Sequence, residues 1–146
     1  MTFIPIELLE TTKFGNEMEA QAREIITKTF NVEVVEITGE DDYKINLYDF
    51  KTSDGIKYEV KGDRLSVKTN NFFIEYEGYG KPSGIEISTA DKWMLLYDNS
   101  FYVIAQTDLM NLVRKEIRIT QNKAKNTWGK LIKVSDVEPY AVIISF

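Results

Sequence analysis

The chain has 146 residues, an apolar fraction of 43% and a net charge of −5, a composition typical of one globular domain large enough to bury a core. It contains no Cys, which excludes thiol nucleophiles, disulfides and thiolate metal sites. It also contains no His, which excludes Ser-His-Asp triads, HNH-type nucleases, His-based zinc hydrolases and zinc deaminases, because each needs an imidazole. Any hydrolytic chemistry must therefore use carboxylates, Lys, Tyr or a metal ion.

Charge is distributed unevenly along the chain. The first fifty residues hold eleven acids and four bases, whereas residues 114–133 hold seven bases and one acid. This asymmetry allows a basic face for a phosphate backbone beside an acidic metal pocket, although the net negative charge argues against a general nucleic-acid coat protein. The first residues lack a basic leader and no apolar run approaches the length of a membrane span, so we expect a cytoplasmic protein with no membrane partner.

A first helix is predicted from a cap at Asn16 to about Phe30. Glu17 and Glu19 fall in its first turn, where acids suit the helix dipole. Glu19 lies at the edge of an apolar face formed by Met18, Ala22, Ile25, Ile26 and Thr29. A strand is expected over residues 31–38. The turn that follows contains Asp41-Asp42, which is either a hydrated turn or a second cation site.

Two strands are predicted on either side of a turn in residues 44–61, where the Asp54-Gly55 pair favours a tight hairpin. In the second strand, a period of two places Glu59 and Lys61 on the same face of the sheet. Hairpin pairing can bring Asp49 of the first strand beside Glu59.

Asp49, Glu59 and Lys61 together form a candidate catalytic site. Mg²⁺ prefers oxygen ligands, and it is commonly held by one or two carboxylates while it keeps several waters. A lysine beside such an ion can orient or deprotonate a water and offset charge on a pentavalent phosphate. Alternatively, these residues are solvated charges on the outer face of a hairpin, since an acid-x-Lys triplet also occurs at residues 42–44 and 49–51.

Further candidate residues follow this hairpin. Arg64 lies just past the second strand, where it either meets a neighbouring phosphate or stays solvated. Residues 72–77 alternate as a strand that places Glu75 and Glu77 on one side. Two acids on one face are unusual in a packed sheet, so at least one of them joins or borders a metal shell, unless this is an edge strand.

The glycine-rich loop of residues 78–84 is the next candidate contact with substrate. Backbone amides in such a loop can approach phosphates closely, and Lys81 and Ser83 add a cation and a hydroxyl. The loop is not a Walker A motif, because it lacks the Gly-Lys-Ser/Thr ending that opens a helix. A flexible hairpin connector would have the same composition.

The rest of the chain is predicted as helix, strand, helix and a C-terminal strand. A capping box at residues 88–91 opens a helix through residue 96, and the strand at 100–105 would return parallel by a right-handed crossover. Thr107-Asp108 caps a helix over 109–115, and residues 141–144 are strand-like. Trp93 and Tyr97 are expected in the core, whereas Trp128, among cations, suits nucleic-acid contact, core shielding or a dimer interface.

These features resemble the PD-(D/E)XK nuclease superfamily, which has a restriction-endonuclease-like fold. The likeness rests on the acid at Asp49, the Glu59-Val60-Lys61 triplet, the acidic helix upstream and the strand-helix-strand downstream. It covers about residues 16–107, and the continuation through residues 71–85 is similar to small phage-encoded endonucleases of this group. Where the family has a leading Pro-Asp pair, this chain has Tyr48-Asp49. The resemblance implies an additional metal-shell Glu on the first helix, for which Glu19 is the choice and Glu17 the reserve.

The sequence therefore predicts an α/β fold with a mixed central β-sheet flanked by helices, in a single nuclease-like domain over residues 1–146. The predicted function is Mg²⁺-dependent endonuclease cleavage of DNA, with Mn²⁺ as a substitute and a homodimer as the default for cutting both strands. In this hypothesis Asp49, Glu59, Glu19 and Glu75 hold or surround the metal, Lys61 activates the water, and Arg64, Lys81 and Ser83 bind DNA. The alternatives are a catalytically inert DNA- or partner-binding protein with this fold, and a metal-dependent phosphoesterase acting on small molecules.

Overall fold

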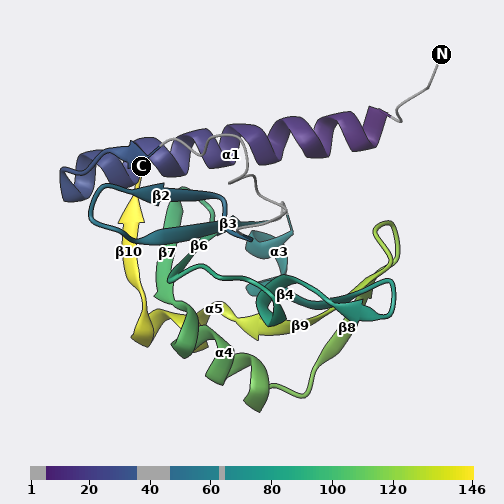
Figure 1. The fold of residues 1–146 in the computed structure, drawn as a ribbon. Helices are drawn as coiled ribbons and strands as arrows, with labels where there is room; N and C mark the ends of the chain where they lie inside the picture. The colour runs from purple at the N-terminus through teal and green to yellow at the C-terminus, as the bar shows by residue number, and fades with distance from the viewer. Residues whose placement is uncertain (1–5, 36–46, 63–64) are drawn as a thin grey trace.

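The computed structural model describes residues 6–35, 47–62 and 65–146, which form three layers (Figure 1). Helix α1 (Ile6–Phe30) crosses one face of a six-stranded sheet. A four-stranded sheet, together with α4 (Gln106–Lys115) and α5 (Val134–Val137), lies on the opposite side. Within the described ranges, no helix has both the length and the apolar character that a membrane crossing requires.

The central sheet contains both parallel and antiparallel neighbours. Its strands, in spatial order, are β1 (Val34–Val35), β2 (Phe50–Thr52), β3 (Lys57–Lys61), β6 (Lys92–Tyr97), β7 (Ser100–Ala105) and β10 (Val142–Ser145). The β3 and β6 strands run parallel, and every other neighbouring pair is antiparallel. This arrangement confirms the predicted α/β class with a mixed central sheet flanked by helices.

The second sheet takes two of its four strands from the connection between β3 and β6. After β3 the chain forms the short helix α3 (Ser66–Thr69), then β4 (Asn71–Gly78), β5 (Lys81–Pro82) and the 3₁₀ turn η2 (Gly84–Glu86). The sheet is completed by β8 (Ile119–Asn122) and β9 (Thr127–Lys133), in the order β5-β4-β9-β8, and the 3₁₀ turn η3 (Glu138–Tyr140) follows α5. The connection between the parallel strands therefore contributes two strands to a separate sheet.

Two apolar clusters cover the two faces of the central sheet. The first packs Met18, Ala22 and Ile26 of α1 against the inner residues of β2, β3, β6 and β7. The second joins the opposite face, including Trp93, to β4, β9, α4 and α5. The sheet is buried on both sides, and this explains why β3 and β6 have consecutive buried residues instead of alternating ones.

The predicted helix over residues 90–96 is wrong, because these residues enter β6. Trp93, Met94 and Leu95 are all buried, and β6 lies between β3 and β7 in the sheet. The Ser88 hydroxyl accepts a hydrogen bond from the Ala90 backbone N–H at 3.2 Å, so the predicted cap closes a turn and starts no helix. The β6–β7 connection is consequently an antiparallel hairpin, with no right-handed crossover.

The predicted helix boundaries also differ from the structure. Helix α1 begins at Ile6, so Asn16 lies inside it and caps nothing, and Thr29, expected on the apolar face, is exposed. Helix α4 begins at Gln106, and no side chain caps it. Of the strand expected over residues 31–38, the structure shows Val34–Val35, and residues 36–38 lie outside the described part.

Candidate active site

The hairpin formed by β2 and β3, the second and third strands of the central sheet, carries the candidate catalytic residues Asp49, Glu59 and Lys61. Phe50 pairs with Tyr58, and the turn is closed by the Gly55 N–H, which donates to the Thr52 carbonyl at 2.9 Å. Gly55 has φ +86°, a conformation that glycine adopts without strain. The predicted hairpin is thus confirmed, with a first strand that starts at Phe50, directly after Asp49.

Asp49 is attached to β3 through both its backbone and its side chain. Its N–H donates to the Tyr58 carbonyl at 2.9 Å, and its Oδ2 accepts a hydrogen bond from the Val60 N–H at 2.7 Å. Burial raises the pKa of Asp49 to about 6, and the charge of Glu19 adds to the rise, against the lowering effect of the Val60 hydrogen bond. Asp49 is therefore held in place as a carboxylate in a poorly solvated position.

Glu59 is the most deeply buried acid of the candidate site. Its side chain is 4% exposed, and its Oε1 lies 3.8 Å from the Lys61 Nζ. Its Oε2 is buried and has no hydrogen-bond partner among the described residues. Burial raises the pKa of Glu59 to about 8, and the charge of Asp49 raises it further, whereas Lys61 lowers it. Glu59 thus lies beside Lys61 and within electrostatic reach of Asp49.

Helix α1 contributes a third carboxylate and a cation near the β2–β3 hairpin. The charge of Glu19 raises the pKa of both Asp49 and Glu59, which places it within electrostatic reach of them. Its Oε1 accepts a hydrogen bond from the Arg23 Nη2 at 3.0 Å, and the same nitrogen lies 3.4 Å from the Asp49 carbonyl. The reserve candidate Glu17 is exposed and lies 3.9 Å from Lys13. The structure thus favours Glu19.

Arg23 is a site residue that the sequence analysis missed. Its guanidinium carbon lies 5.6 Å from the centroid of the Phe50 ring, so the side chain connects α1 to the β2–β3 hairpin. The spacing of four residues between Glu19 and Arg23 was a usable signal, because such pairs face each other on a helix.

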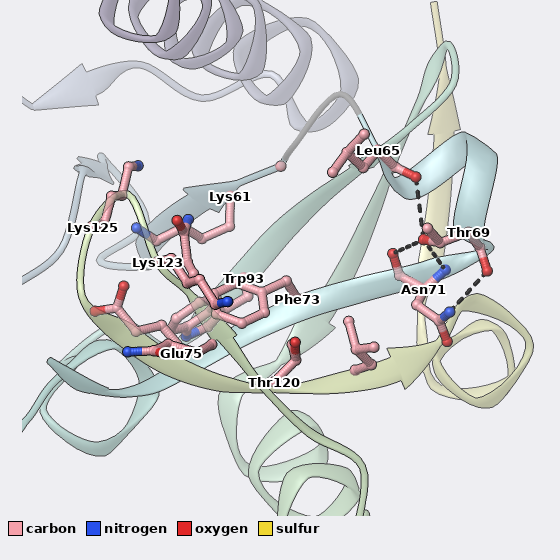
Figure 2. Close-up of a pocket in the computed structure, with 14 residues that line it drawn as sticks. Lys61, Leu65, Thr69, Asn71, Phe73, Glu75, Trp93, Thr120, Lys123 and Lys125 are labelled. Atoms are coloured by element: carbon pink, nitrogen blue, oxygen red, sulfur yellow. Dashed lines mark hydrogen bonds between the residues drawn. The ribbon is translucent and has the colours of Figure 1, made fainter. Parts of the chain in front are cut away.

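A cavity of about 570 Å³ is lined by Lys61 but by none of Asp49, Glu59 and Glu19 (Figure 2). Lys61 and Gly62 line it at the end of β3, and Glu75 lines it from β4. Glu75 therefore shares the cavity with Lys61, but it belongs to the second sheet, and its strand is not a neighbour of β3. The companion acid Glu77 is not among the lining residues.

The residues predicted to bind substrate are not gathered at this cavity. Lys81 is exposed on β5, and neither it nor Ser83 lines the cavity. Tyr79 and Gly80 both have positive φ, at 52° and 76°, as in a tight two-residue hairpin turn. The glycine-rich loop is thus the hairpin connector that the sequence analysis had kept as an alternative. Arg64 and the Asp41-Asp42 pair lie outside the described residues.

The donor set of the cluster suits a hard divalent cation. In the described part of the chain, no three Asp, Glu, His or Cys side chains are arranged so that they could together hold a metal ion. Mg²⁺ commonly takes one or two carboxylates and completes its shell with water and substrate oxygens. Asp49 and Glu59 offer carboxylate oxygens, and the buried Glu59 Oε2 has no partner among the described residues. These two residues therefore fit Mg²⁺.

No protein-family model matches this chain, and no curated protein matches it significantly. The resemblance to PD-(D/E)XK nucleases thus stays a prediction.

Proposed function

We propose that this protein is a Mg²⁺-dependent nuclease that hydrolyses phosphodiester bonds in DNA. The observation that carries the proposal is the state of Glu59, whose buried Oε2 has no partner in the described part of the chain. Buried polar groups are normally hydrogen-bonded, and a buried carboxylate that lacks partners lowers the stability of the fold. A cation bound at this oxygen would remove that cost, which gives the arrangement a functional explanation.

The arrangement of elements around Glu59 supports the same proposal. Helix α1 brings Glu19 near the β2–β3 hairpin, which carries Asp49 and the Glu59-Val60-Lys61 triplet, and the resemblance implies such a grouping. The strand-helix-strand expected downstream is replaced by the second sheet and the β6–β7 hairpin. Because this downstream part differs from the expected pattern, the restriction-endonuclease-like core is proposed from helix α1 and the β2–β3 hairpin alone.

In the proposed mechanism, each residue of the cluster has its own role. Asp49 and Glu59 would hold Mg²⁺, and the ion would supply Lewis-acid stabilisation of phosphoryl oxygens and acidify the attacking water. The Lys61 ammonium lies at the cavity and 3.8 Å from Glu59, where it can orient the attacking water and offset negative charge on the phosphate. Arg23 donates hydrogen bonds to the Glu19 carboxylate and to the Asp49 carbonyl, and so it positions Glu19 and the Asp49 backbone.

A second candidate function is hydrolysis of small phosphoesters such as nucleotides. The observation that favours it is the cavity, whose volume of about 570 Å³ falls within the usual range of small-molecule sites. The site chemistry would be the same, and only the size of the substrate would differ.

Cleavage assays distinguish these functions. The purified protein is incubated with linear, nicked, branched and single-stranded DNA, and separately with free nucleotides, in Mg²⁺ or Mn²⁺. Glu59→Gln and Lys61→Met are compared with Glu77→Gln, an acid-to-amide change outside the cavity. We expect DNA cleavage that is lost in the first two variants and kept in the third. Turnover of nucleotides alone would favour the phosphoesterase, and DNA binding without cleavage in either metal would favour an inert binding protein.

A further inference from the structure

We infer that the cavity beside Lys61 binds a single nucleotide whose base is unpaired, so that the protein prefers single-stranded or extruded nucleotides to intact duplex. This inference rests on the proposed function and specifies its substrate. It is carried by a cavity that combines an aromatic floor, amide and hydroxyl groups, and lysines (Figure 2).

The floor of the cavity contains a ring that the second sheet holds in place. Phe73 of β4 lines the cavity and is partly exposed. A Cβ built at Gly129 of β9 would lie 2.5 Å from the Phe73 Cε2 and 2.6 Å from its Cζ. The Phe73 ring therefore lies directly against the bare backbone of β9, which leaves it a fixed aromatic surface. Base stacking on such a ring depends little on sequence, because every base has a π-face.

Trp93 adds an apolar surface at the same place. Its indole Nε1 donates to the Gln106 Oε1 at 2.8 Å, so its polar atom already has a partner. Gln106 is fixed in turn by its Nε2, which donates to the Ser88 carbonyl at 2.9 Å. Trp93 is buried, so it supports the cavity floor from the core, and Leu131 of β9 extends this apolar lining.

Side-chain amides line the cavity beside the aromatic floor. Asn71 is held by two hydrogen bonds, since its Nδ2 donates to the Thr69 carbonyl at 2.8 Å and its Oδ1 accepts from the Arg118 Nη2 at 3.0 Å. Gln121 and Asn122 line the cavity from β8. An amide carries both a donor and an acceptor, which are the groups needed to contact the edge of an exposed base.

Lysines give the cavity a positive balance in a chain with a net charge of −5. Lys61 lines it from β3, and Lys123 and Lys125 line it from the exposed turn between β8 and β9, whereas Glu75 is the one acid among the lining residues that the structure describes. In Figure 2 the three lysines lie towards one end, and Thr69 and Asn71 lie towards the other. A nucleotide can therefore place its phosphate near Lys61 and its base over Phe73.

A base within an intact duplex cannot occupy this cavity, because both of its faces are covered by its neighbours in the stack. Enzymes that contact the face of a base act on single strands or extrude the base, and extrusion costs a few kcal/mol. The expected order of affinity is therefore single strand, then duplex with one unpaired base, then perfect duplex.

Binding of labelled DNA to the full-length Glu59→Gln protein tests this inference without cleavage. Fluorescence anisotropy in Ca²⁺ compares a short single strand, the same strand in a perfect duplex, and a duplex with one unpaired base. We expect the single strand to bind at least about tenfold more tightly than the perfect duplex. Phe73→Ala should weaken single-strand binding by about 5- to 150-fold, which corresponds to about 1–3 kcal/mol of lost stacking.

Two further variants separate stacking from packing. Phe73→Leu keeps an apolar side chain in the cavity and should lose most of the same affinity, so a folding defect in Phe73→Ala does not decide the result. Tyr140→Ala, which removes an exposed aromatic ring of η3 outside the cavity, should leave binding unchanged. Equal affinity for single strand and perfect duplex, or unchanged binding in Phe73→Leu, would overturn the inference.

The outcomes also separate this inference from the proposed function. Cleavage of DNA by the wild-type protein, with binding that does not depend on Phe73, would keep the nuclease and reject the nucleotide cavity. Single-strand binding that depends on Phe73, without cleavage by the wild-type protein in Mg²⁺ or Mn²⁺, would keep the cavity and reject the nuclease.

Discussion

The carboxyl group of Glu59 is 4% exposed, and burial raises its pKa to about 8. At high pH its negative charge therefore destabilises the folded state. The same carboxyl group titrates near 4.5 in an unfolded chain. Between these two values the folded protein binds a proton that the unfolded protein has already lost. The free energy of unfolding should therefore fall as the pH rises from about 4.5 to about 8.

Glu59→Gln should remove this pH dependence, because an amide has no proton to lose. Without divalent metal, we expect the variant to be more stable than the wild type at pH 9 by ~1–3 kcal/mol, and the two proteins to converge below about pH 4.5. Urea denaturation at a series of pH values measures the difference. Glu77→Gln is the matched control, and equal pH dependence in all three proteins would show that Glu59 ionises without cost.

The residues of the cluster were predictable from sequence because they are close along the chain. Asp49 and Glu59 are joined by a tight turn, and the Asp54-Gly55 pair together with strand alternation fixes their side of the hairpin. The partners of Phe73 and Asn71 were not predictable in this way. They come from β9 and from Arg118, which follow more than forty residues later, and only the tertiary fold brings them together.

At the level of elements, the pairing of β4 with β9 determines the shape of the cavity. Gly129 is essential there, because a Cβ would lie 2.7 Å from the Ile74 carbonyl oxygen as well as against the Phe73 ring. The backbone oxygen cannot move away without disturbing the strand pairing that places Phe73, Glu75 and Asn71 at the cavity.

Gly129→Ala should therefore destabilise the protein by ~1–3 kcal/mol, as is typical of overpacking in a closely packed interior. It should also weaken single-strand binding, because the Phe73 ring has to move. Gly15→Ala is the matched control, since nothing lies within 4 Å of a Cβ at this position in α1 and alanine is the better helix former. Thermal denaturation compares the two variants, and a Gly129→Ala protein as stable as the wild type would contradict the packing described here.

The elements themselves show which signals were sufficient in the sequence. Strong alternation, which is a local signal, identified β4, and the strand predicted over residues 100–105 is β7. The same local reasoning failed for β6, where a serine turn resembled a helix cap and a run of apolar residues fits a buried helix or a buried strand equally well. These residues form a strand because they are buried between β3 and β7, and that burial depends on the whole sheet.

On the scale of the whole molecule, the uneven charge of the sequence corresponds to a spatial arrangement. Glu19 of α1 lies within electrostatic reach of the two acids of the β2–β3 hairpin, and Lys123 and Lys125 of the basic segment line the cavity that Lys61 also lines. The asymmetry was visible in the sequence, but the meeting of these two regions depends on the β8–β9 hairpin. The predicted DNA partner and homodimer stay predictions.

The two turn lysines should contribute to DNA binding mainly through phosphate contacts. Affinity for single-stranded DNA falls as salt rises, and we expect the Lys123→Met/Lys125→Met double variant to make the slope of log affinity against log salt less steep by about 1–2. Lys115→Met, in the same basic segment but outside the cavity, should leave the slope nearly unchanged. Anisotropy titrations over a range of salt concentrations measure the slopes. Equal slopes in the double variant and the wild type would show that these lysines do not contact DNA phosphates.

The most direct test of the account is a crystal structure of the wild-type protein grown in Mn²⁺ near pH 8, with anomalous data collected at the manganese edge. We expect an anomalous peak at ligand distance, about 2.2 Å, from carboxylate oxygens of both Asp49 and Glu59, and we expect no such peak in Glu59→Gln crystals. A wild-type structure at saturating Mn²⁺ that has no peak beside the Glu59 Oε2 would contradict the proposed metal site and the nuclease mechanism that depends on it.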